Sequence, residues 1–158
     1  MSEINLSSFL AARIRGAGAD LEKAMGKMPA DRQNWHPDVE GNIGRDALDQ
    51  MIECGLLNGV IAGAFRSGQA PNPDWDAYAV QKATLDSGEK VMSAFKAGTE
   101  ALASAVESCS AARLTETFID PFFKKEMNWA ELAHFMYWNM AYHEGQINYI
   151  QVLYGDKS

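Results

Sequence analysis

Four long stretches of this chain repeat apolar residues at every third or fourth position, and this spacing constrains the fold more than any other feature. Such a period belongs to a helix that buries one face and leaves the other in water. No segment alternates apolar and polar residues over enough positions to indicate a convincing strand. We therefore expect an all-α protein. In the first stretch the repeating residues are Leu6, Leu10, Ile14, Ala17, Leu21, Met25 and Met28.

Breakers and capping residues indicate where the four helices begin and end. Pro29 closes the first helix, Asn42 is an expected N-cap for the second, and Gly68 follows the second. The clearest start is Asn128-Trp-Ala-Glu131, which has the spacing of a capping box. Four amphipathic helices predict a four-helix bundle. The expected helices cover residues 6–28, 43–66, 86–108 and the stretch between Asn128 and Gly155, with an extra turn near Trp75 and Tyr78.

Length and charge narrow the class of protein further. A chain of 158 residues is enough for one domain, so we expect residues 1–158 to form a single domain. The net charge is −7. Proteins that bind nucleic acid gain much of their affinity by neutralising phosphates, so nucleic acid is not an expected partner.

The cysteine count and the hydropathy pattern indicate a cellular compartment. Two cysteines, Cys54 and Cys109, cannot form the disulfide framework of a small secreted protein. The most apolar stretch, residues 52–65, is interrupted by polar residues and is too short to span a bilayer. The first residues do not have the pattern of a signal peptide. We therefore expect a cytoplasmic protein with no membrane partner.

Three glycines in the second helix are spaced four residues apart, at Gly55, Gly59 and Gly63. Each lowers helix propensity by about 1 kcal/mol relative to alanine. Close approach of another helix would offset that loss. The neighbour is either a helix of the same bundle or the same helix of a second copy, which would make the protein a homodimer.

Polar residues lie on the stripes that should face the bundle interior. Asn139 and His143 are four residues apart on the last helix, and Gln146 follows on the same side. Gln50, Cys54 and Asn58 form a similar row on the second helix, with Glu53 beside it. If the two rows face each other, they enclose a polar pocket for a small-molecule ligand. Aromatic residues are concentrated towards the C-terminus and would line its entrance.

Three histidines alone do not make a metal centre in this chain. His134 and His143 are nine residues apart and so lie on opposite sides of one helix, and His36 lies in a loop. His143 with Cys54 is a two-ligand alternative, to which Glu53 could add a carboxylate. The competing interpretation is that His143 is a hydrogen-bonded core residue and Cys54 a small buried hydrophobe.

The last helix resembles the C-terminal signature of the DinB/YfiT-like superfamily of helical-bundle proteins. The specific part is Tyr142-His143-x-Gly145-Gln146-Ile147 followed by Leu153-Tyr-Gly155-Asp156, and the Trp35-x-Pro37 loop is consistent with it. The resemblance implies a four-helix bundle with a nickel or zinc ion held by three histidines, one on the second helix and two on the last. It also implies that some members are thiol-dependent transferases, and that dimers are frequent.

Only part of that implied metal site is present. His143 matches the last ligand, but Asn139 stands at the preceding ligand position. The ligand on the second helix falls at Cys54, or at Glu53 if the alignment shifts by one residue. Asparagine is a weak ligand for zinc or nickel, whose usual donors are imidazole, thiolate and carboxylate.

These observations predict a DinB-like bundle of unassigned activity. Its three-histidine site is degenerate, with Cys54, Asn139 and His143 at the ligand positions, and its inter-helix pocket carries Gln50, Glu53, Asn58 and Gln146. The cofactor is left unassigned, with zinc or nickel as the metals to test. The alternative hypothesis is a metal-assisted, thiol-dependent S-transferase or hydrolase that uses Cys54 and His143.

Overall fold

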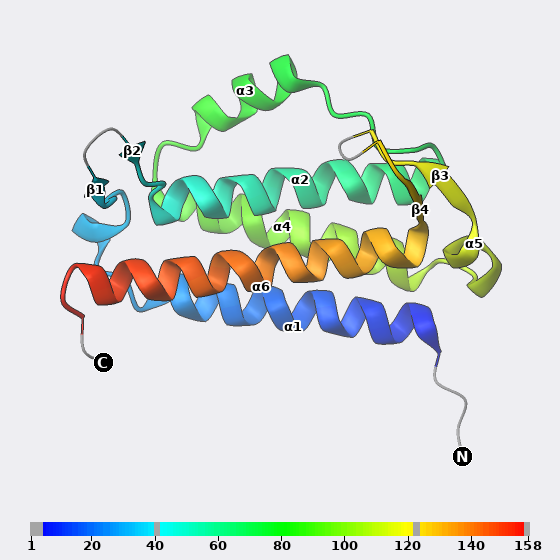
Figure 1. The fold of residues 1–158 in the computed structure, drawn as a ribbon, viewed down its shortest axis with the longest axis horizontal. Coiled ribbons are helices and arrows are strands. Elements are labelled where there is room, and N and C mark those ends of the chain that lie inside the picture. Colours follow the sequence, from blue (N-terminus) through cyan, green and yellow to red (C-terminus); the bar gives the residue numbers. More distant parts are fainter. Residues whose placement is uncertain (1–4, 40–41, 122–123, 157–158) are drawn as a thin grey trace.

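Four long helices pack side by side and form the body of the molecule (Figure 1). The computed structural model describes residues 5–39, 42–121 and 124–156. The predicted all-α four-helix bundle is confirmed. The long helices are α1 (Leu6–Gly26), α2 (Ala47–Ser67), α4 (Gly88–Glu107) and α6 (Trp129–Leu153). The shorter helices are α3 (Trp75–Thr84), α5 (Ala111–Thr115) and a 3₁₀ turn at Ala30–Arg32.

The order of the helices in the bundle is not a simple up-and-down alternation. Gln50 contacts His143 at one end of α2 and Phe65 contacts Trp129 at the other, so α2 is antiparallel to α6. Arg15 pairs with Glu107 and Glu22 pairs with Lys96, so α1 is antiparallel to α4. A hydrogen bond from Gln151 to the carbonyl of Ala24 joins the C-terminal ends of α1 and α6, which run parallel. Consequently α2 and α4 also run parallel. The chain between them must cross back over the bundle, and α3 makes this crossing along the outside of α2 (Figure 1).

The second helix begins later than the sequence pattern predicted. Asp46, and not Asn42, is its N-cap, and the Asp46 side chain accepts a hydrogen bond of 2.7 Å from the amide of Asp49. The expected start is instead occupied by strand β2 (Asn42–Ile43), which pairs with β1 (Asp38–Val39) in a small antiparallel hairpin. Two-residue strands are too short to leave a periodic signal in the sequence.

The connection before the third long helix also holds more structure than the expected extra turn. Residues Trp75–Thr84 form the ten-residue helix α3, capped by Asp74. A second hairpin, β3 (Thr117–Ile119) with β4 (Glu126–Asn128), precedes α6. The predicted capping box at Asn128 and Glu131 is confirmed, with both reciprocal hydrogen bonds at 2.8 Å.

The glycines of α2 do not all serve one interface. A Cβ on Gly98 of α4 would lie 2.1 Å from the carbonyl oxygen of Gly55, so these two glycines allow the backbones of α2 and α4 to touch. Tight packing within the bundle is therefore the role of Gly55. Gly59 and Gly63 are exposed, and a Cβ added at either position would meet no described atom within 4 Å. The homodimer remains a prediction that rests on these two positions.

The pair α2 and α6 makes the least contact of the neighbouring long helices. Near the hairpin end they are joined by aromatic packing, with the rings of Phe65 and Trp129 4.9 Å apart. Further along, polar side chains and open space separate them. None of the described helices combines the length and the apolar character that crossing a bilayer requires.

Candidate functional site

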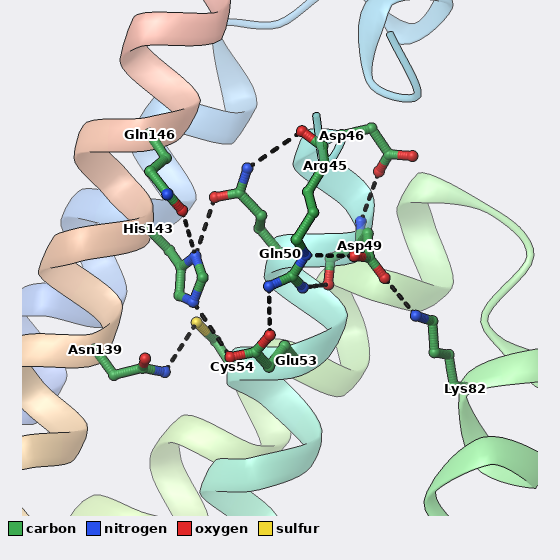
Figure 2. Close-up of polar contacts among 10 residues, drawn as sticks. All are labelled: Arg45, Asp46, Asp49, Gln50, Glu53, Cys54, Lys82, Asn139, His143 and Gln146. Carbon is green, nitrogen blue, oxygen red and sulfur yellow. Dashed lines mark hydrogen bonds and ion pairs between the residues drawn. The ribbon is translucent and has the colours of Figure 1, made fainter. Parts of the chain in front are cut away.

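Polar side chains from α2 and α6 converge where these two helices separate (Figure 2). The structure brings together most of the residues that the sequence placed in the pocket. Those from α2 are Gln50, Glu53 and Cys54, and those from α6 are Asn139, His143 and Gln146.

His143 is the centre of this cluster and is almost completely buried. Its Nδ1 lies 3.0 Å from Oε1 of Gln50 and 3.0 Å from Oε1 of Gln146. The amide nitrogen of Gln50 donates to the carbonyl oxygen of Arg45 at 3.5 Å, which turns the Gln50 oxygen towards the ring. Both neighbours of Nδ1 are amide oxygens, which accept hydrogen bonds, so this arrangement suits the tautomer with a proton on Nδ1. The other ring nitrogen, Nε2, faces Oε1 of Glu53 at 3.4 Å.

Glu53 connects the buried histidine to a surface network of charges. Nη1 of Arg45 donates to its second oxygen at 2.5 Å, and Nε of Arg45 donates to Asp49 at 2.6 Å. The hydrogen bond with His143 lowers the pKa of Glu53; partial burial opposes this effect, and Arg45 reinforces it. Glu53 is therefore a carboxylate at neutral pH. Asp49 extends the network to α3 through an ion pair with Lys82 (Figure 2).

Cys54 lies behind this network and is fully buried. Its sulfur faces the amide nitrogen of Asn139 at 3.8 Å. Burial raises the pKa of the Cys54 thiol, and the nearby Glu53 carboxylate raises it further. A reactive cysteine needs the thiolate form in an accessible, electropositive place. The structure therefore favours the interpretation of Cys54 as a small buried hydrophobe.

Asn58, the third member of the predicted row on α2, lies apart from the cluster. Its amide nitrogen is 3.1 Å from Oγ1 of Thr99 on α4 and 3.3 Å from Sδ of Met140. Its side-chain oxygen is buried and has no hydrogen-bond partner among the described residues. The other two histidines, His36 and His134, are exposed and are not part of the cluster around His143.

A three-ligand metal centre does not fit the donors that are present. Cys54 is fully buried, and Asn139 directs its amide nitrogen, which is not a metal ligand, towards the sulfur. Nδ1 of His143 is occupied by two glutamines. Nε2 of His143 and the Glu53 carboxylate are the donors that remain, and two donors do not make up the usual set of three or four. Among the described residues, no group of three histidine, cysteine, aspartate or glutamate side chains has the geometry of a metal site.

Two hollows flank the cluster. One lies between α2, α3, α6 and the second hairpin and has a volume of about 410 Å³; we call it the α3 cleft. The other, of about 400 Å³, opens beside His143 and is lined by Arg45, Gln50, Gln146 and Tyr149 among others. The α3 cleft is lined by Glu53, Leu57, Ile61, Trp75, Tyr78, Asp120, Met127, Leu132, Phe135, Met136 and Asn139.

Sequence reasoning missed the residues that α3 and the second hairpin bring to the α3 cleft. The sequence indicated only an extra turn near Trp75 and Tyr78, and no pattern singled out Asp120 or Met127. The aromatic pair at a spacing of three residues in an otherwise polar connection was the available signal. Its meaning depends on the crossing of α3 over α2, which no local pattern encodes.

Comparison with known proteins identifies the fold. The sequence matches no protein-family model and no curated protein. Among solved structures, the chain is similar to YfiT from Bacillus subtilis, described as a probable metal-dependent hydrolase with an unusual four-helix bundle topology. The TM-score is 0.71 with 12% sequence identity, over 98% of this chain and 92% of that chain. At this identity the likeness establishes the fold, and it confirms the predicted resemblance at that level.

Proposed function

We propose that this YfiT-like bundle binds a small, largely apolar molecule in the α3 cleft. The observation that carries the proposal is the cleft itself, which has a volume of about 410 Å³ and a mostly apolar lining. Ligand sites in proteins are typically clefts of about 300–1,000 Å³, with apolar walls and a few placed polar groups. Glu53 and Asn139 are polar groups of this kind at the end where α2 meets the His143 cluster.

The walls of the cleft suit a flat or flexible apolar body. Leu57 and Ile61 of α2 face Leu132 and Met136 of α6, and both helices are rigid parts of the bundle. Methionine side chains adapt to the shape of what they contact. The aromatic rings of α3 cover the open side. This arrangement supports reversible binding of a ligand without a large rearrangement of the bundle.

The same geometry supports ligand binding without a three-ligand metal centre. YfiT is described as a probable metal-dependent hydrolase. In this chain, the cluster around His143 offers only His143 and Glu53 as metal donors among the described residues. The alternative of a thiol-dependent transferase or hydrolase finds less support, because Cys54 is buried and its thiol pKa is raised. Elemental analysis of protein purified without chelators or metal resin tests this point. Near-stoichiometric zinc or nickel that is lost in His143→Ala would overturn it.

Binding in the α3 cleft can be tested with an uncharged fluorescent probe, N-phenyl-1-naphthylamine. We expect its emission to rise and shift to the blue on saturable binding to the protein, since the cleft is apolar. Leu57→Trp places a large ring in the cleft and should weaken binding at least tenfold. Leu153→Trp makes the same change in the hollow beside His143 and should leave binding unchanged.

Circular dichroism must first show that both tryptophan variants keep the helical content of the parent protein. Equal binding by the parent, Leu57→Trp and Leu153→Trp would place the probe elsewhere and contradict the proposal. Failure of the parent protein to bind the probe would contradict it as well.

A further inference from the structure

The exposed face of α6 carries far less charge than the exposed face of α4. Over the whole described length of α6, its exposed residues include no lysine or arginine and one carboxylate, Glu131 in the first turn. A helix that is apolar on both sides is typically covered on both sides. The exposed charged residues of α4 are Glu89, Lys90, Lys96, Glu100 and Glu107.

Large apolar residues follow one another along this exposed face of α6, which lies on the near side of the bundle in Figure 1. Their positions advance by steps of three and four residues, the spacing at which one helix packs along another. The rings of Trp138 and Tyr142 stack, with centroids 5.3 Å apart and an angle of 20° between their planes. We call the set the α6 stripe; its members are Trp138, Tyr142, Gly145, Tyr149 and Val152.

The α6 stripe leaves enough apolar surface in water to form the centre of a protein interface. Trp138, Tyr142 and Tyr149 are 50%, 49% and 63% exposed, and Val152 is 63% exposed. A whole aromatic side chain presents about 150–250 Å², so the stripe exposes roughly 400 Å². An interface of standard size buries about 800 Å² on each partner, and a little over half of this area is apolar.

The α6 stripe is nearly symmetric about Gly145. Trp138 lies seven residues before Gly145 and Val152 lies seven residues after it; Tyr142 and Tyr149 lie three before and four after. A two-fold axis at Gly145 therefore brings the stripes of two copies together in antiparallel directions. A Cβ added to Gly145 would meet no described atom within 4 Å, so the bundle itself does not require a glycine there. A second helix that approaches closely does.

The surroundings of the stripe suit a partner of the same charge. The chain has a net charge of −7, so two copies repel each other wherever their carboxylates meet. The exposed residues beside the stripe, from His134 to Leu153, include no carboxylate. Two copies can therefore join here without bringing like charges together.

We infer that two copies of this chain form a homodimer through the α6 stripe, with Gly145 at the two-fold axis. Tyr142 and Tyr149 also line the hollow beside His143, so the second copy covers the mouth of that hollow. This interface lies on another helix than Gly59 and Gly63. It does not depend on ligand binding in the α3 cleft.

Sedimentation equilibrium over a wide range of protein concentrations tests the inference. We expect the parent protein to have the mass of two chains. Gly145→Lys places a long charged side chain of each copy at the axis and should raise the dissociation constant of the dimer at least hundredfold. The free chain should tolerate this change, since lysine has a higher helix propensity than glycine. Trp138→Ala removes the largest ring of the stripe and should raise the dissociation constant at least tenfold.

Gly59→Lys is the matched control, because Gly59 is also an exposed helical glycine whose added Cβ would meet no described atom within 4 Å. It lies on α2 and should leave the dimer unchanged. A monomeric parent protein would overturn the inference and leave the stripe to a different partner. A dimer that dissociates in Gly59→Lys but persists in Gly145→Lys would overturn it as well. Should Gly145→Lys lose helical content by circular dichroism, the masses of the parent protein and of Trp138→Ala still decide the matter.

Discussion

The two buried faces of α2 meet their neighbours in opposite ways. Towards α4, glycine meets glycine, and the two backbones touch at Gly55 and Gly98. Towards α6, the side chains are large or polar, and hollows open on both sides of the His143 cluster. We call the contact of α2 with α4 at Gly55 and Gly98 the seam. One helix, α2, therefore forms both this close contact and a wall of the candidate site.

The difference shows how a small bundle can hold a cleft without losing its core. The α2–α4 seam fixes the position of α2 through backbone contact, which cannot relax by a change of rotamer. The α2–α6 side can then remain partly open, because α2 does not depend on it for placement. This division predicts that substitutions at the seam mainly change stability, whereas substitutions at the open side mainly change binding and pH dependence.

The largest expected effect comes from breaking the seam with Gly98→Ala. The added Cβ would lie 2.1 Å from the carbonyl oxygen of Gly55, so the two helices must move apart. Overpacking of this kind costs roughly 1–3 kcal/mol, and we expect the upper part of that range because backbone atoms are involved. The free energy of unfolding in urea measures the change. A loss below the error of that measurement would mean that the seam is not rigid.

A smaller effect is expected from Glu53→Gln on the open side. At neutral pH this substitution should lower the free energy of unfolding by about 1 kcal/mol, because a charged hydrogen bond is lost at a partly exposed site. Glu53 has a lowered pKa in the folded protein, caused first by its hydrogen bond with His143. The stability that it contributes is therefore complete above the unfolded pKa of glutamate, about 4.3, and is lost as the pH falls through the lower folded value.

The pH dependence of the difference between parent and Glu53→Gln is the decisive measurement. The difference should shrink once the pH falls below the unfolded pKa of glutamate, about 4.3. Glu89→Gln, which changes an exposed glutamate of α4, is the matched control and should follow the parent protein closely. A difference that persists undiminished at low pH would contradict the stabilisation of the Glu53 carboxylate by its partners.

Local signals explain which parts of the molecule the sequence could predict. The start of α6 was predicted correctly because the capping box at Asn128 is made of neighbouring residues. The row Gln50, Cys54 and Asn58 was expected on one face, yet each step of four residues turns about 40° around a helix. Asn58 has therefore rotated away from His143 and towards Thr99 of α4. The same rotation carries Gly59 and Gly63 out of the seam that Gly55 forms.

The α3 cleft could not be predicted, because it depends on the order of the helices in space. Parallel α2 and α4 require a crossing segment, and that segment brings Trp75 and Tyr78 over the gap beside α6. An up-and-down bundle with the same four amphipathic patterns would place them elsewhere. The hydrophobic period specifies which faces are buried, but not which helices face each other.

A modest stabilisation is expected from Gly59→Ala, the counterpart of the seam substitution. Gly59 is exposed and its added Cβ would meet no described atom within 4 Å. Alanine should therefore raise the free energy of unfolding by roughly 0.5–1 kcal/mol through its better helix propensity. Urea unfolding of Gly59→Ala beside Gly98→Ala gives the comparison directly. Destabilisation by both would mean that Gly59 also packs closely against a partner.

A homodimer interface at Gly59 would explain destabilisation by Gly59→Ala, and the homodimer can be tested directly. If Gly59 and Gly63 form a seam between two copies, Gly63→Trp should convert the dimer to a monomer. Light scattering measures the mass of the parent protein and of this variant. A monomeric mass for the parent protein removes the homodimer.

The smallest effect on stability is expected from Lys82→Met, which releases α3 at the ion pair with Asp49. Ion pairs at the surface contribute about 0–1 kcal/mol, and Lys82 is 44% exposed, so the free energy of unfolding should change little. None of the residues of α3 is fully buried, so its attachment depends on a few contacts at the edge of α2. Hydrogen exchange followed by mass spectrometry should show faster exchange over residues 75–84 and unchanged exchange in α4. An equal increase of the exchange rate in α3 and α4 would contradict this expectation. It would mean that α3 unfolds only together with the whole bundle.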